Sequence, residues 1–176
     1  MKLNAKQLRV TLPTEEQLSK IKRRPIYIVL DNVLDTYNVG SIFRLADAIA
    51  AQEVVLCGQT ETPPNSRIHK AAVGTETWIS WRYFSKTLEA LKLLKLENPE
   101  LKIVAVEQDR RSVSLSQITI TNQPIAIVVG HETEGISKEA LDLADAIVEI
   151  PMQGINKSLN VHVAASIVLY KLISFV

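Results

Sequence analysis

The fold of this chain is decided by residues 147–165, which read Ile147-Val148-Glu149-Ile150-Pro151-Met152-Gln153-Gly154-Ile155-Asn156-Lys157-Ser158-Leu159-Asn160-Val161-His162-Val163-Ala164-Ala165. A short apolar strand runs into Pro151, a turn containing Gly154 follows, and an apolar helix is expected to open at Ser158, a good N-cap residue. Open α/β sheets bind ligands where strands give way to helices. The polar side chains of this stretch therefore mark either a ligand site or a helix cap, and the stretch alone favours neither.

The rest of the chain alternates apolar runs of strand length with helical patterns. Near-continuous apolar strands separated by helices predict an α/β fold with a mostly parallel sheet covered on both faces. Strands are expected at 26–30, 54–57, 78–84, 103–106, 125–129 and 146–150. Helices are expected at about 14–24, 39–51, 65–73, over the leucines before Pro99, at 137–143 and from 158 onward.

Length and composition fit one domain, because 176 residues can bury a sizeable core and the net charge is only +1. We expect a short basic N-terminal segment with a helix at 1–24 and the main domain at 25–176. The basic segment is either a nucleic-acid patch or a solvated tail. A single cysteine, Cys57, and the lack of a signal core or membrane span favour a cytoplasmic protein.

A second polar junction follows the strand at 26–30. Asn38 is a residue type that begins helices, and a helix beginning near residue 39 would place Arg44 within its first two turns. Arg44 could then reach a ligand at the strand end. The alternative is an ordinary surface ion pair with Asp35 or Asp47.

The third junction is the loop that follows the strand at 125–129, where Gly130 and Gly135 flank Glu132. Glycines let the backbone approach a ligand closely. The loop is neither a P-loop, since Gly-Lys-Ser/Thr is missing, nor a dinucleotide fingerprint, which follows the first strand. Taken alone, it is also compatible with a plain connection between strand and helix.

The three junctions together resemble a known family. Asn38-x-Gly40-x-x-x-Arg44, Gly130-x-Glu132-x-x-Gly135 and Ile150-Pro151-Met152 leading to Ser158-Leu159-Asn160-Val161 stand in the order of the three motifs of the SPOUT superfamily. The branch they resemble is the SpoU or TrmH type of RNA ribose 2′-O-methyltransferase. The resemblance covers about residues 26–174, and residues 63–74 also resemble that branch.

The resemblance implies a C-terminal deep trefoil knot, S-adenosylmethionine as methyl donor, and tRNA or rRNA as the acceptor. It implies a homodimer to which the final helix contributes. The residues themselves give no reason to expect a metal or a membrane, because the histidines are single and no apolar run is long enough for a span. By position, the donor pocket would be lined by Val106, Gly130, Ile150 and Leu159. The catalytic residues implied are Arg44, Asn38, Glu132, Ser158 and Asn160.

The reaction must remove a proton from a ribose 2′-hydroxyl, which is a weak acid. A guanidinium stays protonated, so Arg44 is expected to stabilise the developing oxyanion or to orient a phosphate. His162, where small or acidic residues are more usual, is interpreted as a helix residue beyond the first turn and not as the base. Two alternatives stay open: a protein of this fold that binds donor and RNA without methylating, and an ordinary nucleotide-dependent α/β enzyme.

Overall fold

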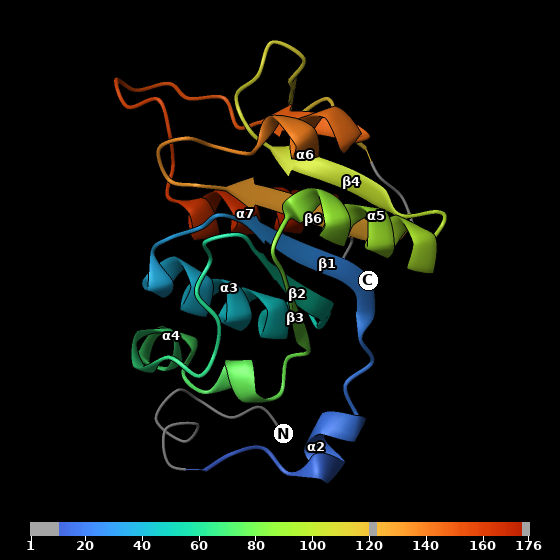
Figure 1. Ribbon diagram of the computed structural model, residues 1–176, viewed down its shortest axis with the longest axis vertical. Helices are drawn as coiled ribbons and strands as arrows, with labels where there is room; N and C mark the ends of the chain where they lie inside the picture. Colours follow the sequence, from blue (N-terminus) through green and yellow to red (C-terminus); the bar gives the residue numbers. More distant parts are fainter. Residues whose placement is uncertain (1–10, 120–122, 174–176) are drawn as a thin grey trace.

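A computed structural model describes residues 11–119 and 123–173. Its centre is a seven-stranded sheet in the order β3-β2-β1-β6-β4-β7-β5, and every neighbouring pair of strands is parallel (Figure 1). The strands are β1 (Arg24–Asp31), β2 (Ala51–Cys57), β3 (Trp81–Phe84), β4 (Lys102–Val106), β5 (Val113–Ser114), β6 (Ile125–Gly130) and β7 (Ala146–Glu149).

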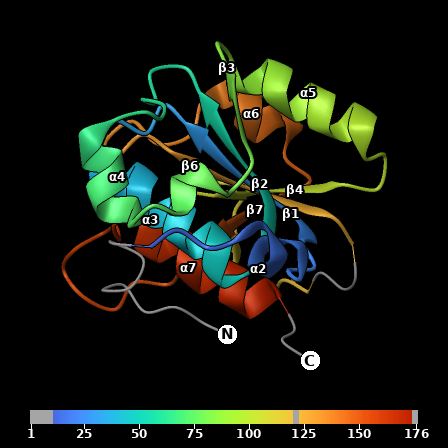
Figure 2. The same ribbon diagram turned by 90° about the horizontal axis from the view of Figure 1, so that it is seen from below.

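Helices cover both faces of the sheet (Figure 2). One face carries α3 (Thr36–Ala48) and α7 (Val161–Leu172), with α4 (Ser66–Ala72) packed on α3. The other face carries α5 (Thr87–Glu97) and α6 (Lys138–Leu143). The other helices within residues 11–119 and 123–173 are α2 (Glu15–Ser19) and the 3₁₀ turn η1 (Thr75–Thr77).

The central strand β1 shows why the apolar runs are continuous and do not alternate. Ile28 and Leu30 point into the core beneath α3 and α7, whereas Tyr27 and Val29 point into a second core beneath α5 and α6. All four side chains are buried because both faces of the sheet are covered. The predicted α/β class with a parallel sheet is therefore confirmed.

Several predicted element boundaries were wrong. The first helix spans only Glu15–Ser19, although Thr14 forms the expected capping box with Gln17. The strand predicted from Trp78 begins at Trp81, because η1 occupies residues 75–77. The short edge strand β5 was not predicted, because two residues carry no periodic signal.

The two helices that bear on the site also begin elsewhere than predicted. Helix α3 begins at Thr36 with Asp35 as its N-cap, three residues before the predicted start. Helix α7 begins at Val161 with Asn160 as its N-cap, so Ser158 lies before the helix and does not cap it. His162 is consequently the second residue of α7, within the first turn and not beyond it.

Some of the predictions from the sequence are not tested by the residues that the structure describes. Three of the seven basic residues of the N-terminal segment, Lys2, Lys6 and Arg9, fall in residues 1–10, outside the described residues. The knot stays a prediction. Within the described part of the chain, every helix is too short or too polar for a membrane span.

Candidate active site

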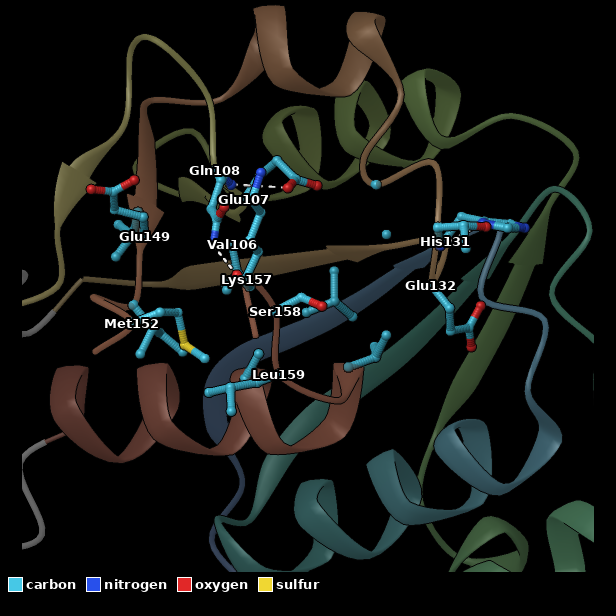
Figure 3. A pocket seen from close by; sticks show the side chains of 18 residues that line it. Val106, Glu107, Gln108, His131, Glu132, Glu149, Met152, Lys157, Ser158 and Leu159 are labelled. Atoms are coloured by element: carbon cyan, nitrogen blue, oxygen red, sulfur yellow. Dashed lines mark hydrogen bonds between the residues drawn. The ribbon is translucent and has the colours of Figure 1, made fainter. Parts of the chain in front are cut away.

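A pocket opens at the carboxyl ends of β4, β6 and β7, where the loops after these strands meet the start of α7 (Figure 3). The four residues expected to bind the donor all line it: Val106, Gly130, Ile150 and Leu159. Glu132 and Ser158, two of the expected catalytic residues, line it as well. Segments about 50 residues apart in the sequence thus meet in one cavity, as the resemblance implied.

The loop after β6 forms a tight turn on one side of the pocket. The amides and carbonyls of His131 and Gly135 pair with each other at 3.0 Å. A Cβ on Gly130 would lie 2.3 Å from the carbonyl carbon of Gly135, closer than atoms can approach. Gly135 itself has φ +73°, in the left-handed region that glycine adopts without strain. Both glycines are therefore needed for this turn.

Two carboxylates, which the sequence interpretation missed, hold the end of this loop. Glu107 Oε2 accepts from the Ile136 amide at 3.0 Å, and Asp31 Oδ2 accepts from the Ser137 amide at 2.7 Å. Asp31 is only 1% exposed and also accepts from the hydroxyl of Thr87. The sequence did carry a signal for them, because Asp31 ends the apolar strand β1 and Glu107 directly follows the apolar strand β4. A charged side chain in such a place needs hydrogen-bonding partners.

Glu132 projects from the same loop toward the start of α3. Its carboxylate accepts from the amides of Leu34 at 3.1 Å and Asp35 at 3.0 Å, and from Asn38 Nδ2 at 3.0 Å. Partial burial raises the pKa of Glu132, but these hydrogen bonds outweigh it and the net pKa is lowered. Glu132 is therefore a fixed anion that positions Asn38.

Asn38 connects this loop to α7. The side chain is 2% exposed, and its Oδ1 accepts from Asn160 Nδ2 at 2.9 Å. His162 Nδ1 lies 3.4 Å from the same oxygen, and Asn160 Oδ1 accepts from the His162 amide at 3.0 Å. The structure thus joins Glu132, Asn38, Asn160 and His162, from three distant segments, in one hydrogen-bonded chain beside the pocket.

Arg44 lies apart from this hydrogen-bonded chain of side chains. It is the ninth residue of α3, about 120° around the helix from the buried Asn38 at 3.6 residues per turn, and its side chain is exposed. It does not line the pocket, and it makes no hydrogen bond or ion pair with the residues the structure describes. The two aspartates considered as its partners bond elsewhere: Asp35 caps α3 and Asp47 accepts from Trp78.

Ser158 lies in the exposed segment 151–160 that leads into α7. Its amide donates to Asn156 Oδ1 at 3.3 Å, and its side chain faces the pocket (Figure 3). Gln108 Nε2 donates to the carbonyl of Lys157, which ties this segment to the loop after β4. Few other contacts hold the segment, so this wall of the pocket is less constrained than the loop after β6.

The pocket is acidic. Glu107, Glu132 and Glu149 line it, against one lysine, Lys157. A concave site with an excess of carboxylates favours a cation, and a sulfonium methyl donor is one. In the described ranges, no three His, Cys, Asp or Glu side chains are placed to hold a metal ion.

Comparisons with known proteins agree with this geometry. Residues 25–170 match the family described as SpoU rRNA Methylase family. The chain is 30% identical over 156 residues to a tRNA (guanosine(18)-2′-O)-methyltransferase of Thermus thermophilus, covering 89% of this chain and 78% of the relative. It is 32% identical to a 23S rRNA (guanosine-2′-O-)-methyltransferase of Nitrosomonas europaea, covering 89% of this chain but only 59% of that relative.

Solved structures share the fold. An S-adenosylmethionine-bound rRNA methyltransferase from Sinorhizobium meliloti superposes with a TM-score of 0.77 at 28% identity, over 86% of this chain and 56% of that one. The TrmH/SpoU tRNA modifying enzyme of A. aeolicus superposes with a TM-score of 0.75 at 28% identity, over 95% and 79% of the two chains. The likeness therefore extends over nearly the whole of this chain.

Proposed function

The chain belongs to the SpoU rRNA methylase family, and we propose that it transfers a methyl group from S-adenosylmethionine to a ribose 2′-hydroxyl of tRNA or rRNA. The relatives named above act on one or the other of these RNAs. We infer that it works in the cytoplasm, where such RNAs are available. The single cysteine, Cys57, is buried and needs no disulfide partner for that environment.

One observation carries the proposal: the residues expected for the donor and all of the residues expected for catalysis except Arg44 meet at one junction. Val106, Gly130, Ile150 and Leu159 line the pocket, and Glu132 in its wall is bonded to Asn38, which is bonded to Asn160. The donor would lie in the pocket with its sulfonium among carboxylates. The ribose would lie beside it, against the chain of amides.

The roles of the acceptor residues follow from their chemistry. Asn38 and Glu132 would hold the arrangement, and Ser158 and Asn160 would hold the target phosphate at the start of α7, where backbone N–H groups favour anions. Arg44 would meet the developing oxyanion as a fixed cation. Since Arg44 stands away from the pocket of its own chain, we propose that it completes the site of a second copy.

The outer face of α7 supports a homodimer. Val163, Ile167 and Tyr170 form a stripe on one face at spacings of four and three residues, and they are 36%, 39% and 51% exposed. Large apolar side chains gathered on one helix face usually mark an interface. Ile167→Glu places a charge in this stripe and should convert a dimer to monomers in sedimentation, with donor binding retained.

Two measurements test the function. Isothermal titration with S-adenosylmethionine should give a heat of binding, and labelled donor incubated with bulk RNA from a host lacking the gene should label tRNA or rRNA. Binding without label in any RNA would favour a protein that binds donor and RNA only. No heat from a folded chain would exclude the donor pocket itself.

A further inference from the structure

His162 follows Val161, which lines the pocket, and its ring faces Asn38, although its sequence position gave no reason to expect a role there. It is the second residue of α7, its ring is partly exposed, and its Nδ1 faces Asn38 Oδ1 at 3.4 Å. Its Nε2 makes no hydrogen bond with the described residues. Which ring nitrogen carries the proton therefore decides what His162 offers to a ligand.

The position of that proton follows from the donor and acceptor roles of the groups in the hydrogen-bonded chain. A carboxylate only accepts, so the Asn38 end that faces Glu132 must be the NH₂ group, which leaves Asn38 Oδ1 facing α7. A backbone amide only donates, so Asn160 presents its oxygen to His162 N and its NH₂ group to Asn38. Both amide orientations are thus set from opposite ends of the chain.

Asn38 Oδ1 is then an acceptor, and His162 Nδ1 can bond to it only as a donor. In the neutral imidazole, one nitrogen carries the proton and the other has a free lone pair. Neutral His162 is therefore the Nδ1–H tautomer, and its Nε2 is a free base.

His131, whose side chain lines the pocket, has the opposite arrangement. Its Nδ1 accepts from the amides of Thr133 at 3.1 Å and Glu134 at 3.2 Å. Because Nδ1 must be unprotonated to accept, the proton of neutral His131 is on Nε2. His131 can donate to a ligand, but its only lone pair is already used.

The other candidates for a base are weaker still. The Glu132 carboxylate already accepts three hydrogen bonds, and its pKa is lowered from 4.5, so it has little affinity for a proton. Arg44 carries a guanidinium, which keeps its protons. His162 Nε2 is thus the free basic nitrogen that the geometry brings to the start of α7.

Resting on the function proposed above, we propose that His162 Nε2 is the general base of the methyl transfer. Nε2 takes the proton of the ribose 2′-hydroxyl as the oxygen attacks the methyl carbon. The carbon–sulfur bond breaks, its electron pair stays on sulfur, and the sulfonium becomes a neutral thioether. The positive charge lost by the donor appears on the imidazolium, which later releases its proton to water.

Several charged groups stand near this junction. Glu132 accepts from Asn38 Nδ2, and Lys157 belongs to the segment that leads into α7. On α3, which packs against α7, Asp35 is the N-cap and Arg44 lies on an exposed face. Asn38, which is uncharged, makes the only hydrogen bond to the ring among the residues that the structure describes.

The decisive variant is His162→Asn, because the asparagine NH₂ group can replace the Nδ1–H bond to Asn38 but offers no basic nitrogen. Single-turnover methyl transfer should fall by about 10²–10⁴, the usual contribution of a general base. The wild-type rate should fall in acid with one protonation step, and the variant should lack that step. Affinity for S-adenosylmethionine should be unchanged.

His69→Asn is the matched control. His69 also bonds through Nδ1, to Glu76 at 2.6 Å, but it lies on α4 outside the pocket. This variant should keep the wild-type rate and acid limb. His162→Gln, which removes the basic nitrogen with a different side chain, should match His162→Asn and guards against loss of fold in one variant.

Three outcomes would overturn the inference. A wild-type rate and unchanged acid limb in both His162 variants would remove His162 as base while leaving the methyltransferase function intact. Nitrogen NMR of the free protein that shows His162 as the Nε2–H tautomer would do the same without any activity assay. Failure of the wild-type chain to methylate any RNA would instead reject the proposed function, and this base with it.

Discussion

The proposed donor half and the proposed acceptor half of the site differ in how completely one chain builds them. All four residues expected for the donor line one pocket, and the loop on one side of it is closed by backbone pairing between His131 and Gly135. The acceptor half has Asn38, Glu132 and Asn160 bonded together, but Arg44 stands on an exposed face of α3 without a partner among the described residues.

This difference indicates which kind of mutation should damage each half. A donor pocket made by main-chain loops depends on close backbone approach, so it is sensitive to added volume. An acceptor half made by side chains depends on hydrogen-bonding groups, so it is sensitive to their removal. Mutations that separate donor affinity from methyl transfer are therefore the direct test of the division.

Among the residues expected from the family motifs, Arg44 should give the largest effect on the acceptor half when it is replaced by alanine. Loss of one donor to a developing oxyanion costs on the order of 10²–10³ in rate, and donor affinity should be unchanged since Arg44 does not line the pocket. Rapid-quench methyl transfer and titration calorimetry measure the two. Arg44→Lys should also be slow, because a lysine lacks the planar fork; a near-normal rate with a shifted pH optimum would contradict this role.

Mixing variants tests whether Arg44 acts across a dimer. Subunits with Arg44→Ala keep their donor pocket, and subunits with Gly130→Ala keep their arginine. If Arg44 serves the partner's site, randomly mixed dimers should regain about a quarter of the wild-type rate, because half of them hold one intact site of two. No recovery beyond the separate variants would place Arg44 in the site of its own chain.

Gly130→Ala should break the donor half. The new Cβ would lie 2.3 Å from the backbone of Gly135, so the turn after β6 must open. Overpacking of this kind costs about 1–3 kcal/mol, which corresponds to roughly five-fold to 150-fold weaker donor binding when the cost falls on the bound state. Calorimetry reads the affinity, and Gly154→Ala is the control, since a Cβ there meets nothing within 4 Å.

Sequence patterns predicted the architecture because a strand that is covered on both faces needs a continuous apolar run, and such runs can be seen in the sequence. They did not predict which polar residue begins each site helix. Ser158 and Asn160 are both good N-caps, and Asn160 is used because its amide bonds to Asn38, 122 residues away. Likewise Asp35, not Asn38, caps α3, while the Asn38 side chain is bonded to Glu132.

The same reason limited the prediction of the site. The residues expected for the donor could be named because the resemblance to the SPOUT superfamily assigns that role to their motif positions, and the structure brings them to one pocket. Asp31 and Glu107 were missed, since their partners are amides of residues 136 and 137, far along the chain. His162 was placed beyond the first turn of α7 because the start of that helix was predicted three residues too early.

Asn160→Ala sharpens the comparison at the boundary between the halves. It removes the bond to Asn38 and the N-cap of α7. A lost cap costs about 1 kcal/mol of stability, and loss of the bond should slow methyl transfer about ten-fold. Donor affinity should stay within the error of calorimetry, because Asn160 does not line the pocket. An equal loss of affinity and rate would move Asn160 into the donor half.

Replacing Glu132 by glutamine should give the smallest effect, a change in how the stability of the fold depends on pH. Its pKa is raised by burial but lowered more by its hydrogen bonds, so the folded value lies below the ordinary 4.5. A carboxyl with a lowered folded pKa stabilises the fold above its unfolded pKa, and that contribution is lost as the pH falls through the folded value. The wild-type melting temperature should therefore exceed that of Glu132→Gln at neutral pH, and the gap should close below pH 4.5.

Because Glu132 is exposed, we expect a gap of only a few degrees for a chain of this length, as about 1 kcal/mol shifts the midpoint by about 2–4 °C. A gap that stays constant down to the acid transition would show that the carboxylate positions Asn38 through shape and not through charge.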